Sequence, residues 1–299
     1  MRFCLVELSG RSGPVLGVER DGGVLPLDAP PSLRDALERF GDEGLLRHAK
    51  NASGKPVPMS SVTRWHPPVP NPRTFRDFYA FEQHVKAART RRGLEMIPEW
   101  YELAIFYFSN TGSLKGHLEP VKKPACVNEL DLELELGAVI GRDVMDVKGE
   151  AAEQAIFGFT NLNDWSARDL QRGEMKCSLG PAKGKDFSTS IGPWLVTRDE
   201  LEDRHVALGE WNLAMTARRN GKEMSRANAK DIYHDFSKMI ERGSRDAMMY
   251  KGDLIGSGTV GTGCILELGP ENTGGWLKPG DTIEIEIERL GVLTTPIVE

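Results

Sequence analysis

Acidic side chains alternate with leucines between residues 131 and 136. Residues two apart in a β-strand share a face, so Asp131, Glu133 and Glu135 would point the same way, roughly 7 Å apart. Carboxylates at that spacing repel one another and raise one another's pKa unless a cation compensates, and an all-oxygen set suits Mg²⁺ or Ca²⁺ better than zinc. The simpler interpretation is a half-buried strand with a solvated acidic face over a leucine core.

A second acidic segment, residues 163–169, follows an apolar run and contains Asp164 and Arg168. Asn163 or Asp164 is a suitable N-cap for a helix that begins here, which leaves the other group free. Asp164 and Arg168 are four residues apart, so on a helix they could form an ordinary surface pair. Taken alone, the segment favours a capped helix with such a pair.

A histidine follows an aspartate by seven residues in the segment from Asp77 to His84. Residues 73–91 are rich in helix formers, and helical positions seven apart share a face, about 10 Å apart along the axis. Asp77 and His84 could therefore face one cleft. An ordinary surface or core histidine is the simpler interpretation of this segment.

Two glycine-rich segments resemble nucleotide-binding loops, but each departs from the pattern. Lys185 is preceded by glycines, yet Asp186 stands where a phosphate-binding loop has Ser or Thr. Residues 256–261 match G-x-G-x-x-G, but residues 262–268 predict a strand, whereas the dinucleotide fingerprint requires a helix there. The first segment therefore favours a solvated turn, and no NAD site is expected at the second.

The elements that must position these residues are mostly strands. Residues 1–66 predict a small β-rich domain with a helix from Ser32, and the four prolines of residues 67–72 predict an extended linker. Residues 73–299 predict a second domain of many strands, among them 282–289, with few helices, one of them at 231–240. The predicted fold class is α+β and β-rich.

Composition excludes several classes of protein. The 299 residues carry a net charge of −6 and include 32 glycines and 18 prolines, which favours β structure over a helical bundle. The acidic balance provides no basic surface for nucleic acid, and no apolar run reaches the roughly 18 residues of a membrane span. The four scattered cysteines predict reduced thiols, and no signal-peptide pattern opens the chain. A cytoplasmic protein is expected.

Together these segments resemble the fumarylacetoacetate hydrolase superfamily from about residue 72 to the C-terminus. The hallmarks stand in the family's order at 77–84, 131–135, 163–171, 179–187, 256–259 and 277–281. The resemblance implies a catalytic domain built as a mixed β-roll, preceded by a small N-terminal β domain and usually found as a homodimer. It also implies one divalent cation, Mg²⁺ or else Ca²⁺ or Mn²⁺, held by carboxylates.

The resemblance also implies roles for particular residues. The implied metal ligands are Asp77, Glu133, Glu135 and Asp164, whereas Asp131 matches no ligand position. The implied catalytic residues are His84, Glu267, Lys185, Arg168 and Gln171, with Glu267 orienting His84. The implied substrate-binding residues are Tyr79 and Thr259.

The implied activity is hydrolysis of a C–C bond in a 1,3-diketo or acylpyruvate acid, of the kind met in aromatic catabolism. The adjacent oxygens of such a keto acid chelate a hard cation, His84 would deprotonate the attacking water, and Lys185 would stabilise oxyanionic charge. Met175 and Ser188 stand where fumarylacetoacetases carry tyrosine and glycine, so the resemblance implies the reaction class rather than that substrate. The alternatives are a decarboxylase, keto–enol isomerase or hydratase using the same cation, and a non-catalytic binding protein.

Overall fold

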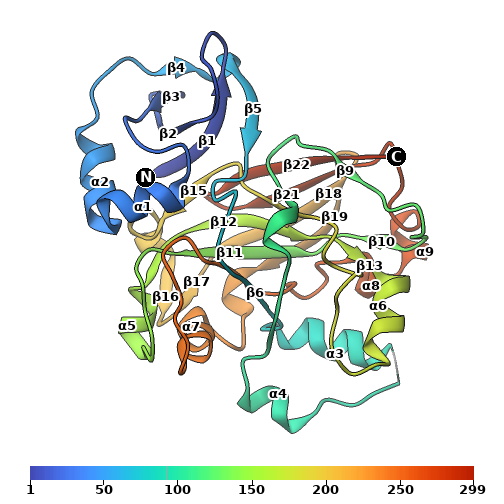
Figure 1. The fold of residues 1–299 in the computed structure, drawn as a ribbon. Helices are drawn as coiled ribbons and strands as arrows, with labels where there is room; N and C mark the ends of the chain where they lie inside the picture. Colours follow the sequence, from blue (N-terminus) through green and yellow to red (C-terminus); the bar gives the residue numbers. More distant parts are fainter. Residues whose placement is uncertain (92) are drawn as a thin grey trace.

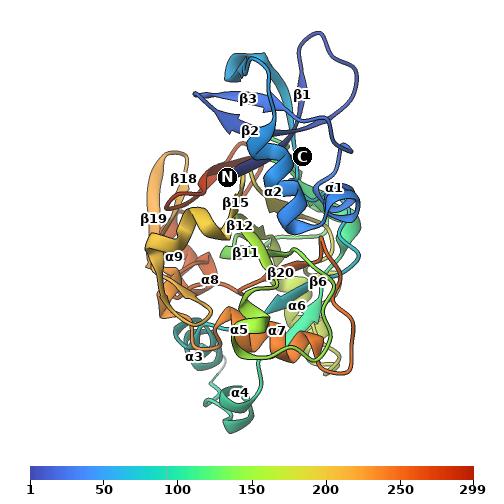
Figure 2. The same cartoon turned by 90° about the vertical axis from the view of Figure 1, so that its left-hand side faces the viewer.

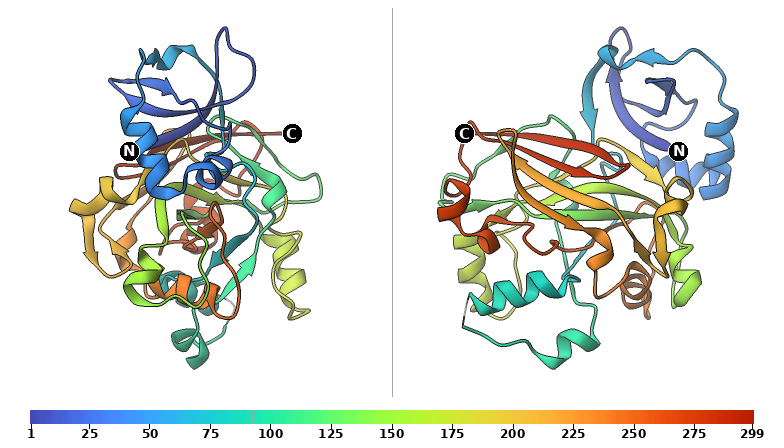
Figure 3. Two further views of the ribbon diagram at one scale, coloured as in Figure 1. Left: turned by 60° about the vertical axis from the view of Figure 1, so that its left-hand side comes forward. Right: turned by 180° about the vertical axis from the view of Figure 1, so that it is seen from behind.

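The computed structural model describes residues 1–91 and 93–299, which form two large β-sheets with short helices at their edges (Figure 1). The N-terminal strands lie at one end of the molecule and helices α3 and α4 at the other, and the turned views keep this arrangement (Figure 2, Figure 3). The predicted β-rich α+β class is confirmed.

The larger sheet draws its strands from almost the whole chain. Within the described residues it has 13 strands, with the order β4-β3-β2-β1-β15-β12-β11-β20-β6-β7 and with β5, β8 and β14 paired at its sides. Their bounds are β1 (Arg2–Leu8), β2 (Val15–Arg20), β3 (Gly23–Pro26), β4 (Val57–Pro58), β5 (Val62–His66), β6 (Phe75–Phe78) and β7 (Phe106–Phe108). The others are β8 (Leu114–Lys115), β11 (Leu134–Ile140), β12 (Ile156–Asp164), β14 (Thr189–Ile191), β15 (Leu195–Thr197) and β20 (Leu254–Gly256).

The second sheet packs beside the first through strands β21 and β22, which contact β12. Its order is β19 (Lys222–Asn228), β18 (Ala214–Arg219), β21 (Thr282–Ile287), β22 (Gly291–Val298) and β9 (Val121–Lys122). Two further strand pairs are β10 (Leu130–Asp131) with β13 (Ser166–Ala167), and β16 (His205–Ala207) with β17 (Glu210–Trp211). Buried and half-buried residues alternate along β21, as expected for a strand with one face on the core.

The helices are short and lie outside the sheets. They are α1 (Leu33–Phe40), α2 (Asp42–Asn51), α3 (Glu82–Thr90), α4 (Pro98–Glu102), α5 (Gly149–Glu153), α6 (Arg168–Met175), α7 (Phe236–Ser244), α8 (Ile265–Leu268) and α9 (Pro270–Thr273). Short 3₁₀ segments are η1 (Met59–Ser61), η2 (Thr111–Ser113), η3 (Arg198–Arg204) and η4 (Ala229–Asp231). Within the described residues, no helix combines the length and the apolar composition needed to cross a membrane.

Cap residues explain where two predicted helices begin. Ser32 accepts a hydrogen bond from the backbone N–H of Asp35 at the start of α1, so the predicted helix from Ser32 is confirmed. Helix α7 begins at Phe236 rather than at the predicted residue 231, because Asp235 caps it by accepting from the N–H of Lys238 at 2.9 Å.

The division of the chain at residues 67–72 stays a prediction. These residues form neither helix nor strand. Strand β1 pairs with β15 through Phe3 and Leu195, so the N-terminal strands continue the larger sheet and share hydrogen bonds with the rest of the molecule.

Two of the predicted elements around the candidate site are wrong in type. Residues 73–91 form strand β6 followed by helix α3, so Asp77 and His84 do not share a helix face. The predicted strand over residues 262–268 is a turn followed by helix α8. In both places local composition was overridden by sheet pairing and by the packing of α3 against α8.

Two others are wrong in their bounds or burial. The predicted half-buried strand over residues 131–136 is split into β10 and β11, and β11, which pairs with β12 and β20, is buried at every position and therefore on both faces. Asn163 and Asp164 end strand β12 instead of capping a helix, and α6 begins at Arg168. Asp164 and Arg168 are therefore both buried and do not form a surface pair.

Candidate active site

Three carboxylates from different strands of the larger sheet meet in the interior. Asp77 comes from β6, Glu135 from β11 and Asp164 from the last position of β12, and each is at most 2% exposed. Their ligand oxygens lie within 4.8 Å of one another. We call these residues the acidic triad; its oxygen donors are of the type that hard cations such as Mg²⁺, Mn²⁺ and Ca²⁺ prefer.

Gly256 leaves space for two carboxylates of the acidic triad. It lies on β20, between β11 and β6, where it is the register partner of both Gly137 and Asp77. A Cβ atom at Gly256 would overlap Asp77 Oδ1 and lie 3.0 Å from Glu135 Oε2. Two carboxylates can approach each other here because this position has no side chain.

The rest of the glycine-rich segment is also packed against protein. A side chain at Gly258 would overlap the carbonyl oxygen of Phe78, and one at Gly261 would overlap Gln83 Oε1. No NAD site was expected here because a strand was predicted over residues 262–268. That reason is wrong, since helix α8 follows the segment. The first backbone amides of that helix, those of Ile265 and Leu266, already donate to the carboxylate of Asp131 at 2.7 and 3.0 Å.

Neighbouring donors hold the triad in place. The hydroxyl of Tyr107 donates to Asp164 Oδ2 and lies 3.4 Å from Asp77 Oδ2, while Thr189 Oγ1 donates to Asp164 Oδ1 at 3.2 Å. The amide of Gly258 donates to Glu135 Oε2 at 3.2 Å. Thr259, predicted to bind substrate, lies 3.5 Å from Glu135 Oε1, so the structure places it beside the acidic triad.

The electrostatics of the triad favour a cation. Burial raises the pKa of Asp77, and the nearby charge of Asp164 raises it further. Burial likewise raises the pKa of Glu135, with the charge of Asp77 acting in the same direction. Asp77 Oδ1 is buried and has no hydrogen-bond partner among the described residues. A hard divalent cation would neutralise this repulsion and give that oxygen a partner, so the donor set fits the implied metal.

Glu133 lies beside the triad but is bound by two cationic side chains. Lys185 Nζ donates to Glu133 Oε2 at 2.5 Å, and Arg168 Nη2 donates to Oε1 at 2.8 Å. Burial would raise the pKa of Glu133, but the charges of Lys185 and Arg168 outweigh burial and hold it well below its usual value. Lys185 also lies 2.7 Å from Asp164 Oδ2, so it links Glu133 to the triad.

Arg168 has a structural role on its other side. Its Nε donates to Asp131 Oδ2 at 2.8 Å, and its Nη1 donates to Gln171 Oε1 at 3.0 Å. Asp131 therefore binds Arg168 and the start of α8 rather than joining the triad. Gln171 is half-buried one turn along α6, and the contact places it next to the site through Arg168.

The predicted base His84 and its orienting carboxylate Glu267 are far apart in the sequence but in contact in the structure. His84 Nδ1 contacts Glu267 Oε1, and both side chains are almost fully buried. The amide of Thr262 donates to Glu267 Oε2 at 2.6 Å, which fixes the carboxylate. The ring of Tyr79 stands edge-on to the ring of His84, with centroids 5.3 Å apart. Gly263, the residue after Thr262, accepts a hydrogen bond from the backbone amide of Leu134 at 3.0 Å, so the pair lies close to the segment that carries Glu133 and Glu135.

Tyr107 is one site residue that the sequence did not single out. It lies on β7, which pairs with β6 so that Tyr107 faces Asp77 across the two strands. The only signal in the sequence was the aromatic run Phe106-Tyr107-Phe108, which reads equally well as an edge strand of the core.

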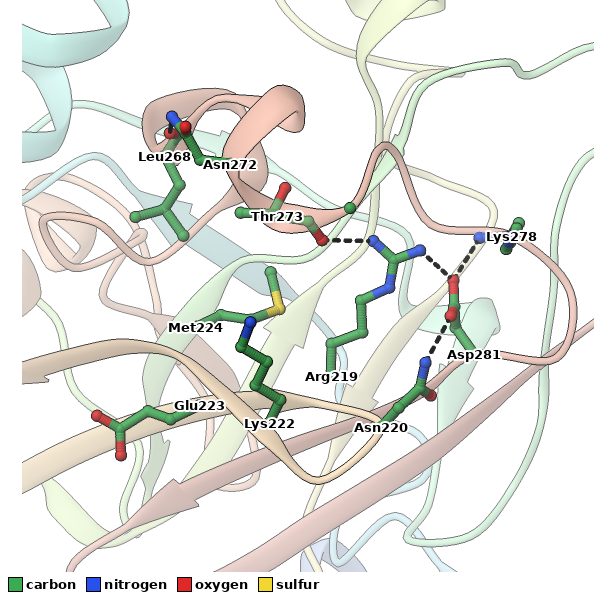
Figure 4. Close-up of a pocket in the computed structure, with 11 residues that line it drawn as sticks. Arg219, Asn220, Lys222, Glu223, Met224, Leu268, Asn272, Thr273, Lys278 and Asp281 are labelled. Atoms are coloured by element: carbon green, nitrogen blue, oxygen red, sulfur yellow. Dashed lines mark hydrogen bonds and ion pairs between the residues drawn. The ribbon is translucent and has the colours of Figure 1, made fainter.

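A separate hollow of about 610 Å³ lies at the edge of the second sheet, around Arg219 (Figure 4). Arg219, the last residue of β18, donates to the carbonyls of Thr273 at the end of α9 and of Gly275 in the loop that follows, and it pairs with Asp281 at 2.6 Å. Asn220 also binds Asp281 at 2.9 Å, and none of the predicted site residues lines the hollow. The hollow is therefore distinct from the acidic triad.

Comparison with known proteins gives this arrangement a family context. The family model described as fumarylacetoacetate (FAA) hydrolase, C-terminal, matches residues 73–298. A protein named as a mitochondrial oxaloacetate tautomerase from Homo sapiens is 30% identical over 296 residues, covering 96% of this chain and 88% of the relative.

Solved structures have the same fold over the full length of the chain, which confirms the predicted fold. A 5-carboxymethyl-2-hydroxymuconate delta-isomerase from Mycobacterium smegmatis is 25% identical with a TM-score of 0.73, covering 100% of this chain and 99% of that one. A maleylpyruvate hydrolase from a Sphingobium species, in complex with manganese(II) and pyruvate, has a TM-score of 0.74 at 24% identity, with the same coverage.

Proposed function

Because the chain belongs to the fumarylacetoacetate hydrolase family, we propose that it is a divalent-cation-dependent hydrolase. It would cleave a C–C bond in a 1,3-diketo or acylpyruvate acid. The observation that carries the proposal is the buried contact between His84 and Glu267, whose neighbouring loop bonds to the strand segment of Glu135 in the acidic triad. A histidine held by a carboxylate is suited to take a proton from water, and the triad supplies the donors for a hard cation.

Asp77, Glu135 and Asp164 would hold the cation, with Glu133 as a fourth carboxylate of the same region. When bound, a hard cation supplies Lewis-acid polarisation of the two oxygens of a chelating dicarbonyl acid. Mg²⁺, Mn²⁺ and Ca²⁺ all suit an all-oxygen set, and Mg²⁺ is our first candidate.

His84 would act as the general base. Its Nδ1 is engaged with Glu267, which leaves Nε2 to accept the proton of the attacking water. The Glu267 carboxylate would fix the ring and offset the positive charge that the imidazole gains. The Thr262 amide keeps Glu267 in place during this transfer.

Lys185 and Arg168 would offset negative charge on the substrate and on the developing oxyanion. Both side chains are buried, and both already face Glu133. Burial would lower the pKa of Lys185, but Asp164 and Glu133 outweigh it and raise that pKa, so Lys185 carries its charge at neutral pH. A fixed cation in a buried site acts strongly on charge that develops next to it.

A panel of acylpyruvates and 1,3-diketo acids, followed by the loss of enol absorbance and by product analysis, tests the proposal. We expect cleavage of at least one member that requires Mg²⁺ or Mn²⁺ and stops on chelation. Absence of cleavage across the panel in the metal-loaded protein would refute the hydrolase proposal.

Oxaloacetate tautomerisation is the second candidate, favoured by the relative that is 30% identical over nearly the whole chain. The same base and cation site would move a proton between carbon and oxygen without breaking a C–C bond. Oxaloacetate freshly dissolved in its enol form discriminates between the two, because a tautomerase speeds the loss of enol while total oxaloacetate stays constant.

The setting of this reaction also stays a prediction. We propose a homodimer that acts on a small keto acid in the cytoplasm. Because a relative is named as mitochondrial, the compartment of this protein should be measured by localisation microscopy.

A further inference from the structure

Cys264 places a sulfur atom beside the His84–Glu267 pair. It immediately precedes α8, three residues before Glu267, and its side chain is 1% exposed. Cys264 Sγ lies 3.8 Å from Glu267 Oε1. A His84 nitrogen, this sulfur and a Glu267 oxygen all lie within 4.8 Å of one another.

This donor set differs in chemistry from the acidic triad. One nitrogen, one sulfur and one oxygen are the ligands that zinc binds in proteins, whereas Mg²⁺ and Ca²⁺ take oxygen almost exclusively. Ligand atoms around one tetrahedral zinc lie about 3.5 Å apart, close to the observed separation of Sγ and Oε1. Three protein ligands also leave a fourth position for water, as in zinc sites that are not purely structural.

The two sets of donors share no residue. The triad is Asp77, Glu135 and Asp164, and the second set lies between α3 and α8. A soft or borderline ion can therefore bind at the second set while a hard ion occupies the first.

We propose that His84, Cys264 and Glu267 form a second, inhibitory metal site that takes zinc or a similar borderline divalent cation. On binding, the ion forms a bond to Cys264 sulfur and the thiol proton is released to solvent, with no change of oxidation state. A ring nitrogen of His84 and an oxygen of Glu267 become ligands at the same time. The base is then no longer available to water, so turnover stops.

The inhibition rests on the proposed function, because it assumes that His84 is the base. The binding of the ion does not, because three donors of these types hold it whatever the reaction is. The test therefore reads binding and inhibition separately.

The experiment uses the full chain saturated with Mg²⁺, in a Cys126→Ser and Cys177→Ser background. Those two cysteines are exposed and would otherwise bind added metal themselves. Co²⁺ replaces zinc as the spectroscopic probe, because a cobalt–thiolate bond absorbs in the near ultraviolet. Cys264→Ser and Cys264→Ala are compared with this background, and each variant is checked for folding by its melting temperature.

We expect one equivalent of Co²⁺ to give the thiolate band in the background protein and no band in either Cys264 variant. Zn²⁺ should inhibit turnover of the background protein at saturating Mg²⁺, and loss of the sulfur should weaken that inhibition by at least about tenfold when each variant is compared with its own turnover without Zn²⁺. A band that survives in folded Cys264 variants, or no band in the background protein, would overturn the site. A normal band without any effect of Zn²⁺ on turnover would overturn the inhibition alone, and a chain that binds Co²⁺ through Cys264 but turns over no keto acid would count against the proposed function instead.

Discussion

Lys185 Nζ donates to Glu133 Oε2 at 2.5 Å, and both side chains are withdrawn from solvent. Arg168 takes the other oxygen of the same carboxylate at 2.8 Å. The charge of Glu133 is thus compensated by the protein, whereas among residues 1–91 and 93–299 no lysine or arginine forms an ion pair with Asp77 or Glu135. An added metal ion would therefore neutralise more uncompensated negative charge at Asp77 and Glu135 than at Glu133.

Replacement of Glu135 by Gln should remove most of the affinity for Mg²⁺ and Mn²⁺ while the metal-free chain stays folded. Burial and like charge raise the pKa of Glu135, so a neutral side chain of the same shape is well tolerated there. We expect affinity to fall by at least about tenfold in titration calorimetry. Glu129→Gln is the control, since Glu129 pairs with Arg172 near the surface and should leave metal binding unchanged. Normal Mg²⁺ affinity in Glu135→Gln would refute the assignment of the triad.

Gly256→Ala should also weaken metal binding, although glycine offers no ligand atom. Its Cβ would overlap Asp77 Oδ1, so that carboxylate must move away from Glu135. Gly173→Ala is the matched control, because nothing lies within 4 Å of a Cβ at that position and alanine favours the helix there. The measurement is the Mn²⁺ dissociation constant of the two variants; equal constants would show that the packing at Gly256 does not shape the site.

His84→Ala should strongly reduce hydrolysis and leave the affinity of the acidic triad for Mg²⁺ nearly unchanged. General acid–base catalysis by one group contributes about 10²–10⁴-fold, so a loss of that size is expected in steady-state turnover. Glu267→Gln keeps the histidine but removes the charge that offsets its protonation, and its loss should be smaller. Hydrolysis that survives in folded His84→Ala would assign the base to another residue.

Arg168→Met should destabilise the chain strongly, because it leaves Asp131 and Glu133 buried without their shared partner. Breaking a buried ion pair costs about 3–5 kcal/mol of unfolding free energy. Arg172→Met, four residues further along α6, removes an exposed pair with Glu129 and should cost less than about 1 kcal/mol. Urea unfolding of both variants measures the difference, and similar losses would mean that the buried pairs add no net stability.

Predictions from the local sequence were correct where residues close together in the sequence determine the element. Ser32 caps a helix that begins directly after it, and the alternating pattern from Thr282 forms a strand with one face on the core. They failed where neighbours in space decide the element. Residues 262–268 carry apolar side chains that suit a strand, yet Ile265–Leu268 form a helix whose first amides bind the carboxylate of Asp131.

The sequence by itself determined the chemical types available to the site and the order in which they occur. Carboxylates, a histidine and a lysine stand in segments whose order resembles one family, and that likeness named Asp77, His84 and Glu267 together. Only the tertiary structure decided which of them meet. The period of a strand fixes the face on which a side chain lies but not the strand beside it. Pairing of β6 with β20 and of β11 with β12 therefore brought the acidic triad together, and the packing of α3 on α8 brought His84 to Cys264 and Glu267.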